Sequence, residues 1–159
     1  MKKKLVKSCL ISISAVGIGY ILKNYITDIS NTYEEEKSRY ISYYYIIQEW
    51  MFNKQKGKTI ENYLEKNNIN NIAIYGMGTL GKMLYDDIKN TNIKISYIID
   101  KTLEKNWDEV PIINLKDIKD YPMVDAIIIT PIYNYVHIIQ EIKNYKINFL
   151  TISLEQLIL

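Results

Sequence analysis

The chain has 159 residues with 48% hydrophobic side chains, and its 20 basic and 18 acidic residues leave a formal charge of +2. This length fits one domain with an additional segment, and the interspersed charges provide no basic field suited to binding nucleic acid. A single cysteine, Cys9, and a single histidine, His137, exclude an intramolecular disulfide and a structural zinc site with the usual ligand set.

The N-terminal segment, residues 1–28, combines four lysines in its first seven residues with an uncharged run from Ser8 to Leu22. At 1.5 Å per residue this run is short for a bilayer core of about 30 Å, although residues 5–22 extend it toward a thin span. We therefore predict a membrane-seeking helix that associates with the bilayer through residues 5–22. Two alternatives stay open: an amphipathic or buried helix, and a cleaved signal peptide.

Residues 29–66 are predicted to form a helical connector. Apolar residues recur in steps of seven, four, three and four, a spacing that places one stripe along an amphipathic helix. The stripe consists of Tyr33, Tyr40, Tyr44, Ile47 and Met51. It indicates either a helix packed on the following domain or a coiled-coil contact through residues 33–51. Gly57 ends this helix, and a short second helix follows over residues 59–66.

Residues 67–159 alternate between strand and helix patterns. The apolar runs predict five strands, over residues 71–75, 94–100, 110–113, 125–130 and 148–152. Helical spacing occupies residues 79–90, 115–119 and 134–144, and Ser153 can cap a short terminal helix. In the helix over 134–144 we expect Val136, Ile139 and Ile142 to face inward. This alternation predicts an α/β fold with three layers, in which helices cover both faces of a five-stranded, mainly parallel sheet.

Three of the six glycines fall in one turn between the strand over 71–75 and the helix over 79–90. They complete the pattern G-x-G-x-x-G, in which Gly76 permits the tight turn, Gly78 lets a pyrophosphate approach the backbone, and Gly81 lets the helix pack closely on the strand. The amide groups at the helix start then face the anion. The predicted ligand-binding residues of the turn are Gly76, Met77, Gly78, Thr79, Leu80 and Gly81. The alternative is a structural turn in a domain that has lost its ligand.

Asp100 ends the predicted strand over 94–100, nineteen residues after Gly81. This spacing is close to the roughly twenty residues at which a Rossmann-type carboxylate accepts the ribose hydroxyls of a dinucleotide. A carboxylate there repels a 2′-phosphate, so we predict NAD in preference to NADP as the cofactor, with Lys101 as a neighbouring contact. The alternative is that Asp100 only ends the strand in a turn.

The strand over 125–130 is expected to end at the same edge of the sheet as the glycine turn. Ligands of open α/β folds bind at the carboxyl ends of the strands. Thr130, Pro131 and Tyr133 are therefore added to the predicted cofactor site. His137 is predicted to lie on the helix surface or partly buried, and a contact with the ligand is the alternative.

No catalytic residue is identifiable from the sequence. Tyr-x-x-x-Lys pairs, in which the lysine lowers the tyrosine pKa for proton transfer in short-chain dehydrogenases, occur only before the fourth predicted strand. They are Tyr33/Lys37, Tyr85/Lys89 and Tyr97/Lys101. The adjacent acids Asp86 and Asp87 are expected to lie solvated on an exposed helix face. Whether the chain is an enzyme is left open.

From about Tyr40 to Leu159 the chain resembles small Rossmann-like nucleotide-binding proteins of Gram-positive bacteria that are associated with capsular and other cell-surface polysaccharide synthesis. The resemblance is carried by residues 72–81, 97–101 and 124–131, together with Trp50 and Gly57-Lys58. It implies a ligand that is NAD(P) or a sugar nucleotide such as a UDP-sugar.

The leading hypothesis is a Rossmann-like protein that binds NAD or a related nucleotide as a sensor or accessory subunit in polysaccharide synthesis. The helix over 33–51 would contact a second copy of the chain or a polysaccharide-synthesis enzyme. The protein would be membrane-associated, with its nucleotide domain in the cytoplasm. The basic N-terminus also favours the cytoplasm, whereas a single span would place the N-terminus and the domain on opposite sides of the membrane. The orientation of a spanning segment is therefore left open. The alternatives are a sugar-nucleotide oxidoreductase or epimerase that acts with a partner chain, and an interaction module that binds no ligand.

Overall fold

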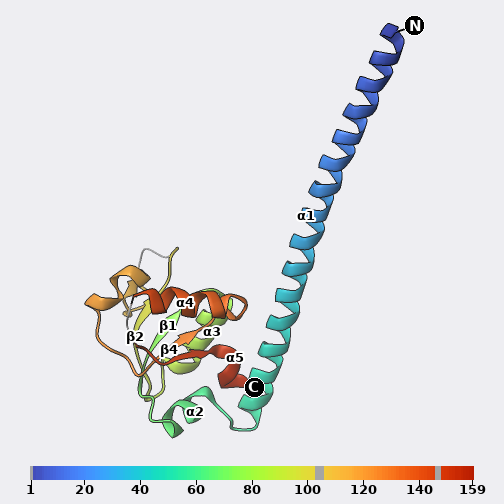
Figure 1. The fold of residues 1–159 in the computed structure, drawn as a ribbon. Coiled ribbons are helices and arrows are strands. Elements are labelled where there is room, and N and C mark those ends of the chain that lie inside the picture. The colour runs from blue at the N-terminus through green and yellow to red at the C-terminus, as the bar shows by residue number, and fades with distance from the viewer. Residues whose placement is uncertain (1, 103–105, 146–147) are drawn as a thin grey trace. The chain divides into compact units, whose positions relative to one another are not determined.

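The computed structural model describes residues 2–102, 106–145 and 148–159, with side chains from residue 17 onward. The helices are α1 (Lys2–Gln55), α2 (Ile60–Lys66), α3 (Thr79–Ile88), α4 (Tyr135–Asn144) and α5 (Leu154–Ile158), with 3-10 helices η1 (Leu115–Asp120) and η2 (Ile132–Asn134) (Figure 1). The strands are β1 (Asn71–Tyr75), β2 (Lys94–Ile99), β3 (Ile112–Ile113), β4 (Ala126–Ile129) and β5 (Thr151–Ser153). The chain divides within α1 into two compact units, unit 1 over Met1–Tyr44 and unit 2 over Tyr45–Leu159.

Helix α1 joins the two helices predicted at the N-terminus into one. Among the described residues, no helix is both long enough and apolar enough to cross a bilayer. Most of the predicted membrane segment, residues 5–16, lies outside the described side chains. The association of residues 5–22 with a membrane therefore stays a prediction.

The five predicted strands form one sheet in the order β3-β2-β1-β4-β5, and every neighbouring pair is parallel. The predicted α/β class and five-stranded sheet are confirmed, and the sheet is parallel throughout rather than mainly parallel. All four residues of β4 are buried, as expected for a strand that helices cover on both faces. This arrangement is consistent with a Rossmann-like fold.

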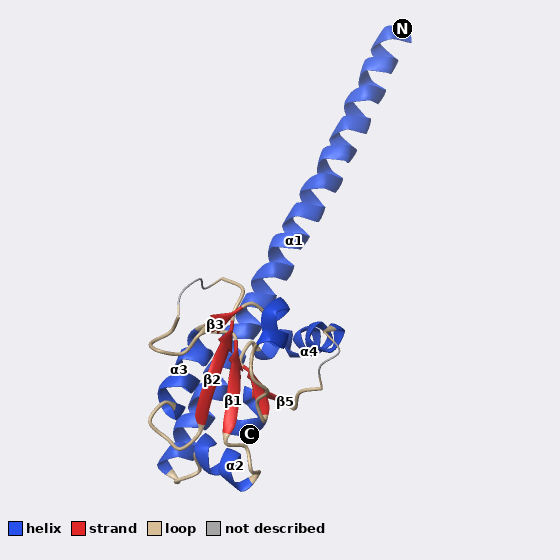
Figure 2. Ribbon diagram, turned by 90° about the vertical axis from the view of Figure 1, so that its left-hand side faces the viewer, coloured by secondary structure: helices blue, strands red, loops and turns tan. Residues whose placement is uncertain are grey.

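Helices cover both faces of the sheet. On one face, α4 and η1 pack against alternate strand residues, and Ile138 and Ile142 of α4 belong to this core. Right-handed connections place α3 on the other face, and Figure 2 shows α3 and α4 on opposite sides of the strands. The buried side of α3 includes Leu80, Leu84 and Ile88. The carboxyl ends of the strands therefore lie between two helical layers.

The buried side of α4 differs from the predicted one. Val136 is 69% exposed and Ile139 is only partly buried, whereas Ile138 and Ile142 are buried. The prediction was wrong for Val136 and is confirmed for Ile142, and Ile139 packs against the same core while partly buried. Because Ile138 and Ile142 lie one helical turn apart, they bury more aliphatic area together than a face that includes the smaller Val136.

The last turns of α1 belong to unit 2 and contact α3 through Asp87. Trp50 is buried there, while Met51 of the predicted stripe is exposed. The Trp50 Nε1–H donates to Asp87 Oδ2 at 3.1 Å, and Lys54 is ion-paired with the same carboxylate. With its side chain only 10% exposed, Asp87 is not solvated as predicted, whereas Asp86 does lie on the exposed face. The prediction failed because the pattern of α3 alone carries no information on a partner 37 residues away.

Tyr97 of β2 is fully buried in the core on the α4 face. Its ring lies 5.6 Å from that of Tyr121, and its hydroxyl has no hydrogen-bond partner among the described residues. Burial raises the pKa of Tyr97 to about 12, because the phenolate would lose its hydration. A buried hydroxyl without a partner costs about 1–3 kcal/mol.

We expect Tyr97→Phe to raise the free energy of unfolding at pH 7 by about 1 kcal/mol, since phenylalanine fills the same space without the unpaired hydroxyl. Tyrosine in the unfolded chain ionises near pH 10, whereas the folded-state pKa is about 12. The unfolded state therefore loses its proton first, and the wild-type protein loses stability between these values. The variant lacks this loss, so its advantage should widen above pH 10.

Urea unfolding at pH 7 and pH 11, followed by tryptophan fluorescence, measures both effects. Tyr63→Phe is the matched control, because Tyr63 is partly exposed at the surface. A lower stability of Tyr97→Phe at pH 7 would show that the hydroxyl has a partner.

Candidate functional site

The carboxyl ends of β1, β2 and β4 meet at one edge of the sheet, where the strands end at Tyr75, Ile99 and Ile129. After β1 the chain passes to β2 on one side, while β4 and β5 lie on the other side of β1. The order of the strands thus reverses between β1 and β4. Ligands of open α/β sheets bind in the crevice at such a switch point.

Gly76 begins the glycine turn in a left-handed backbone conformation, with φ +90°. A Cβ atom at this position would lie 2.7 Å from the Pro131 ring and 3.1 Å from Thr130 Oγ1. The Thr130 hydroxyl donates to the carbonyl of Gly76 at 2.8 Å. Thr130 and Pro131 therefore fix the turn from the end of β4.

The other two glycines have different surroundings. A Cβ on Gly81, in the first turn of α3, would lie 2.0 Å from the carbonyl oxygen of Gly76, so only glycine allows α3 to approach the turn this closely. Gly78 is the N-cap residue of α3, and a Cβ there would have no atom within 4 Å. The space beside Gly78 is open, and the first amide groups of a helix have no acceptor within the helix. An anion can therefore reach the start of α3.

Asp100 follows β2 and braces the glycine turn. Its Oδ2 accepts the N–H of Met77 at 2.8 Å, and its Oδ1 accepts the N–H and the hydroxyl of Thr102, each at 2.8 Å. The carboxylate thus joins the segments after β1 and β2. Ribose hydroxyls would therefore reach this carboxylate by displacing one of these donors, such as Thr102.

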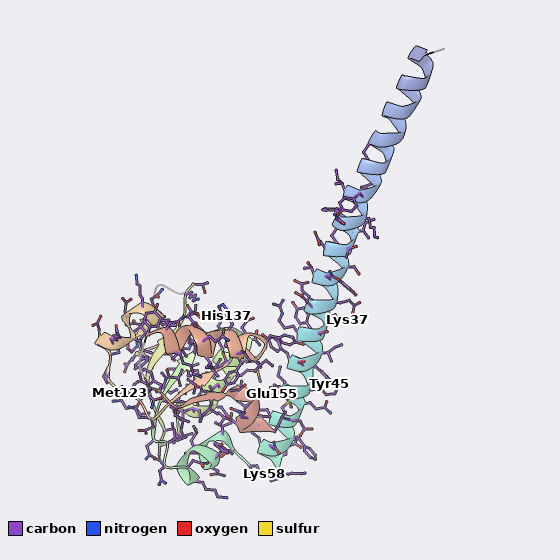
Figure 3. All side chains as sticks on the ribbon, viewed as in Figure 1. Lys37, Tyr45, Lys58, Met123, His137 and Glu155 are labelled. Carbon is purple, nitrogen blue, oxygen red and sulfur yellow. The ribbon has the colours of Figure 1, made fainter. Side chains whose placement is uncertain are left out.

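A hollow of about 550 Å³ opens at this edge of the sheet. Its walls are the glycine turn from Gly76 to Gly78, the segment from Asp100 to Thr102, and one side of α4 that includes His137 and Glu141. Figure 3 labels His137 on α4. The volume lies within the range of about 300–1,000 Å³ that is typical of small-molecule sites.

Glu141 connects the two sides of the hollow. Its carboxylate is ion-paired with Lys101 Nζ at 2.8 Å and accepts the hydroxyl of Tyr75 at 3.3 Å. Burial, followed by the charge of Glu141, raises the pKa of Tyr75 to about 12. The walls thus carry two carboxylates, Asp100 and Glu141, against one ammonium group, while the start of α3 carries positive helix-dipole charge. This distribution suits a ligand with hydroxyl or amino donors on one part and an anion on another.

The structure brings together six of the eleven predicted site residues. Those that line the hollow are Gly76, Met77, Gly78, Asp100, Lys101 and Pro131. Thr79 is exposed at the start of α3, and Leu80 is buried in the core. Gly81 and Thr130 support the turn from behind, and Tyr133 is exposed outside the lining.

The contribution of α4 to the hollow was missed. Asn134, the N-cap residue of α4, lines it together with His137 and Glu141 of the helix. For His137, a ligand contact was only the alternative to a surface or partly buried position. Steps of three and four residues place side chains on one side of a helix. The helix also starts just after β4, at the edge of the sheet where ligands bind. This position and the spacing of residues 134, 137 and 141 together could have identified the three residues from the sequence.

The two catalytic arrangements considered are a metal centre and a Tyr-x-x-x-Lys pair. Among the described residues, no group of three or more His, Cys, Asp or Glu side chains could hold a metal ion. Tyr85 and Tyr97, which belong to Tyr-x-x-x-Lys pairs, are both buried in the domain. The chain matches no protein-family model and no curated protein.

Proposed function

We propose that the chain binds a dinucleotide or sugar nucleotide, with NAD preferred, in the hollow beside the glycine turn. The observation that carries this proposal is the open space at Gly78, where an added Cβ would meet no atom within 4 Å. Gly76 and Gly81, in contrast, are tightly enclosed. A phosphate placed beside Gly78 accepts the amide groups at the start of α3 and benefits from the helix dipole.

The carboxylates of the hollow support the preference for NAD over NADP. Asp100 is bonded to Met77, inside the glycine turn, so its charge lies next to the proposed anion site. Glu141 adds a second carboxylate to the walls, and its ion pair with Lys101 offsets that charge. The charge of Asp100 opposes a 2′-phosphate on the ribose, whereas free ribose hydroxyls can donate to a carboxylate.

A sensor or accessory role is proposed in preference to catalysis of sugar-nucleotide oxidation. A tyrosine that transfers a proton near neutral pH needs a lowered pKa. Tyr75 borders the hollow, but its pKa is raised to about 12 by burial and by Glu141. This shift has the wrong direction for a catalytic acid or base.

The cellular setting is proposed from the resemblance of residues 72–81, 97–101 and 124–131 to proteins of cell-surface polysaccharide synthesis. In this setting the chain would serve a polysaccharide-synthesis enzyme and associate with the membrane through residues 5–22. The nucleotide domain would lie in the cytoplasm, where its ligand is found.

Isothermal titration calorimetry of the full chain with NAD, NADP and UDP-glucose tests the proposal. We expect NAD to bind and NADP to bind roughly tenfold more weakly, a difference of about 1.4 kcal/mol. Gly78→Ala should weaken NAD binding by tenfold or more, since its methyl group enters the anion site. Gly17→Ala, a matched change at an open position of α1, should have no effect. Absence of binding by all three nucleotides would refute the proposal.

A further inference from the structure

Unit 1 exposes a continuous apolar stripe along α1. Ile26, Tyr33 and Tyr40 follow one another in steps of seven residues, and so do Leu22 and Ile29. These five side chains are between 53% and 65% exposed. In the described part of unit 1, residues 2–44, the chain is helical throughout, so no second element of this unit covers the stripe. Such a large exposed apolar surface marks an interaction site.

The spacing of the stripe is that of a coiled coil. Ile26, Tyr33 and Tyr40 occupy the a positions of successive heptads, and Leu22 and Ile29 occupy the d positions, alternating in steps of four and three. The next d position holds Glu36. A single polar residue in an otherwise apolar seam fixes the register of the paired helices at some cost in stability.

The opposite side of the helix is polar and acidic. A helix wheel of 100° per residue places Asn24, Thr27, Asp28, Asn31, Glu34, Glu35 and Ser38 there. Helices that lie on a bilayer surface carry lysine and arginine on their polar side, where they meet anionic lipids. Carboxylates on this side repel such a surface, so the stripe over residues 22–40 favours a protein partner.

Charge complementarity selects a second copy of the same chain. In a parallel, in-register pair, a d residue packs next to the e residue of the other helix. Here Glu36 occupies d and Lys37 occupies e, so each Glu36 meets the Lys37 of the second copy. Within one helix, Lys37 pairs with Glu34 at 3.5 Å and Glu36 with Arg39 at 3.8 Å, both at exposed positions where they can rearrange.

We propose that residues 22–40 of two chains form a parallel, in-register coiled coil, so that the protein is a homodimer with two copies of unit 2. Tyr33 and Tyr40 stack against their counterparts, and the Glu36–Lys37 contacts on both sides of the seam fix the register. This inference stands on α1 alone and is independent of nucleotide binding by unit 2.

Figure 3 labels Lys37, which lies beside the proposed seam on α1. Sedimentation equilibrium of the full chain tests the proposal. The wild-type protein should have twice the 18.8 kDa mass of one chain. Ile29→Asp should raise the dissociation constant by at least about tenfold, because it replaces an apolar contact with two carboxylates, and the adjoining e residue, Ser30, carries no charge that could neutralise them. Asn31→Asp adds the same charge on the polar side and should leave the mass unchanged.

A charge reversal tests the orientation. Glu36→Lys and Lys37→Glu should each weaken the dimer, and the double variant should restore it, because each helix then meets the opposite charge again. Ile29→Cys in a Cys9→Ser background should form an interchain disulfide on mild oxidation, since d residues face each other only in the parallel register. A monomeric wild-type chain would overturn the proposal, as would a dimer insensitive to Ile29→Asp.

Discussion

Gly81→Ala is expected to lower the free energy of unfolding of unit 2 by about 3 kcal/mol or more, at the upper end of the cost of overpacking. The added methyl carbon would lie 2.0 Å from the carbonyl oxygen of Gly76. Neither partner can yield easily, because the contact involves backbone on both sides and Thr130 holds that same carbonyl through its hydroxyl. To separate the methyl group from this carbonyl, α3 has to move away from β1. This movement opens the core beneath Leu80 and Leu84.

Thermal unfolding followed by tryptophan fluorescence measures this effect. Both tryptophans, Trp50 and Trp107, belong to unit 2, so the signal excludes the helix of unit 1. A loss of about 3 kcal/mol corresponds to a fall in Tm of roughly 10 °C for a domain of this size. Gly78→Ala is the matched control and should lower the Tm by no more than about 3 °C, because its methyl group meets no atom and the exchange loses only the preference of an N-cap for glycine over alanine. Equal Tm values for the two variants would contradict the packing described for the turn.

The strands were predictable because their signal is local. The runs of β1, β2 and β4 are rich in isoleucine and are bounded by turn residues, and their continuous apolar character already requires cover on both faces. The failures concern contacts between segments that are distant in the chain. Asp87 accepts a hydrogen bond from Trp50, which lies 37 residues upstream. The orientation of α4 about its own axis depends on which of its isoleucines pack against the sheet.

The same distinction applies to the candidate site. The glycine pattern and its spacing to Asp100 could be read from the sequence because both follow from the geometry of one β-α-β unit. The bond from Met77 to Asp100, across 23 residues, and the bond from Tyr75 to Glu141, across 66 residues, could not. Both bonds depend on which segments the fold brings together, and they change how the site can act. Asp100 holds the turn in place as well as facing the hollow.

Asp100→Asn is therefore expected to be nearly as damaging as Asp100→Ala. Alanine removes the acceptor of three donors, the N–H of Met77 and the N–H and hydroxyl of Thr102, and should cost about 1–3 kcal/mol. Asparagine keeps the size of the side chain but has one acceptor oxygen, so its NH₂ group must face either Met77 or Thr102, both of which donate. If Asp100 served only to end β2 in a turn, asparagine would replace it at little cost, since it is an equally favourable turn residue.

Urea unfolding of the two variants, with Asp120→Asn as a control at an exposed position, separates these roles. The control should retain wild-type stability, and an Asp100→Asn protein as stable as the control would show that the hydrogen bond to Met77 contributes nothing to stability.

Calorimetry on the same proteins then tests whether Asp100 binds the ligand. Loss of the charge should weaken NAD by roughly tenfold, because a charge-assisted hydrogen bond to the ribose contributes about 1.5–3 kcal/mol. The affinity for NADP should fall less, because removing the carboxylate also removes its repulsion of the 2′-phosphate, so the ratio of the two affinities should narrow.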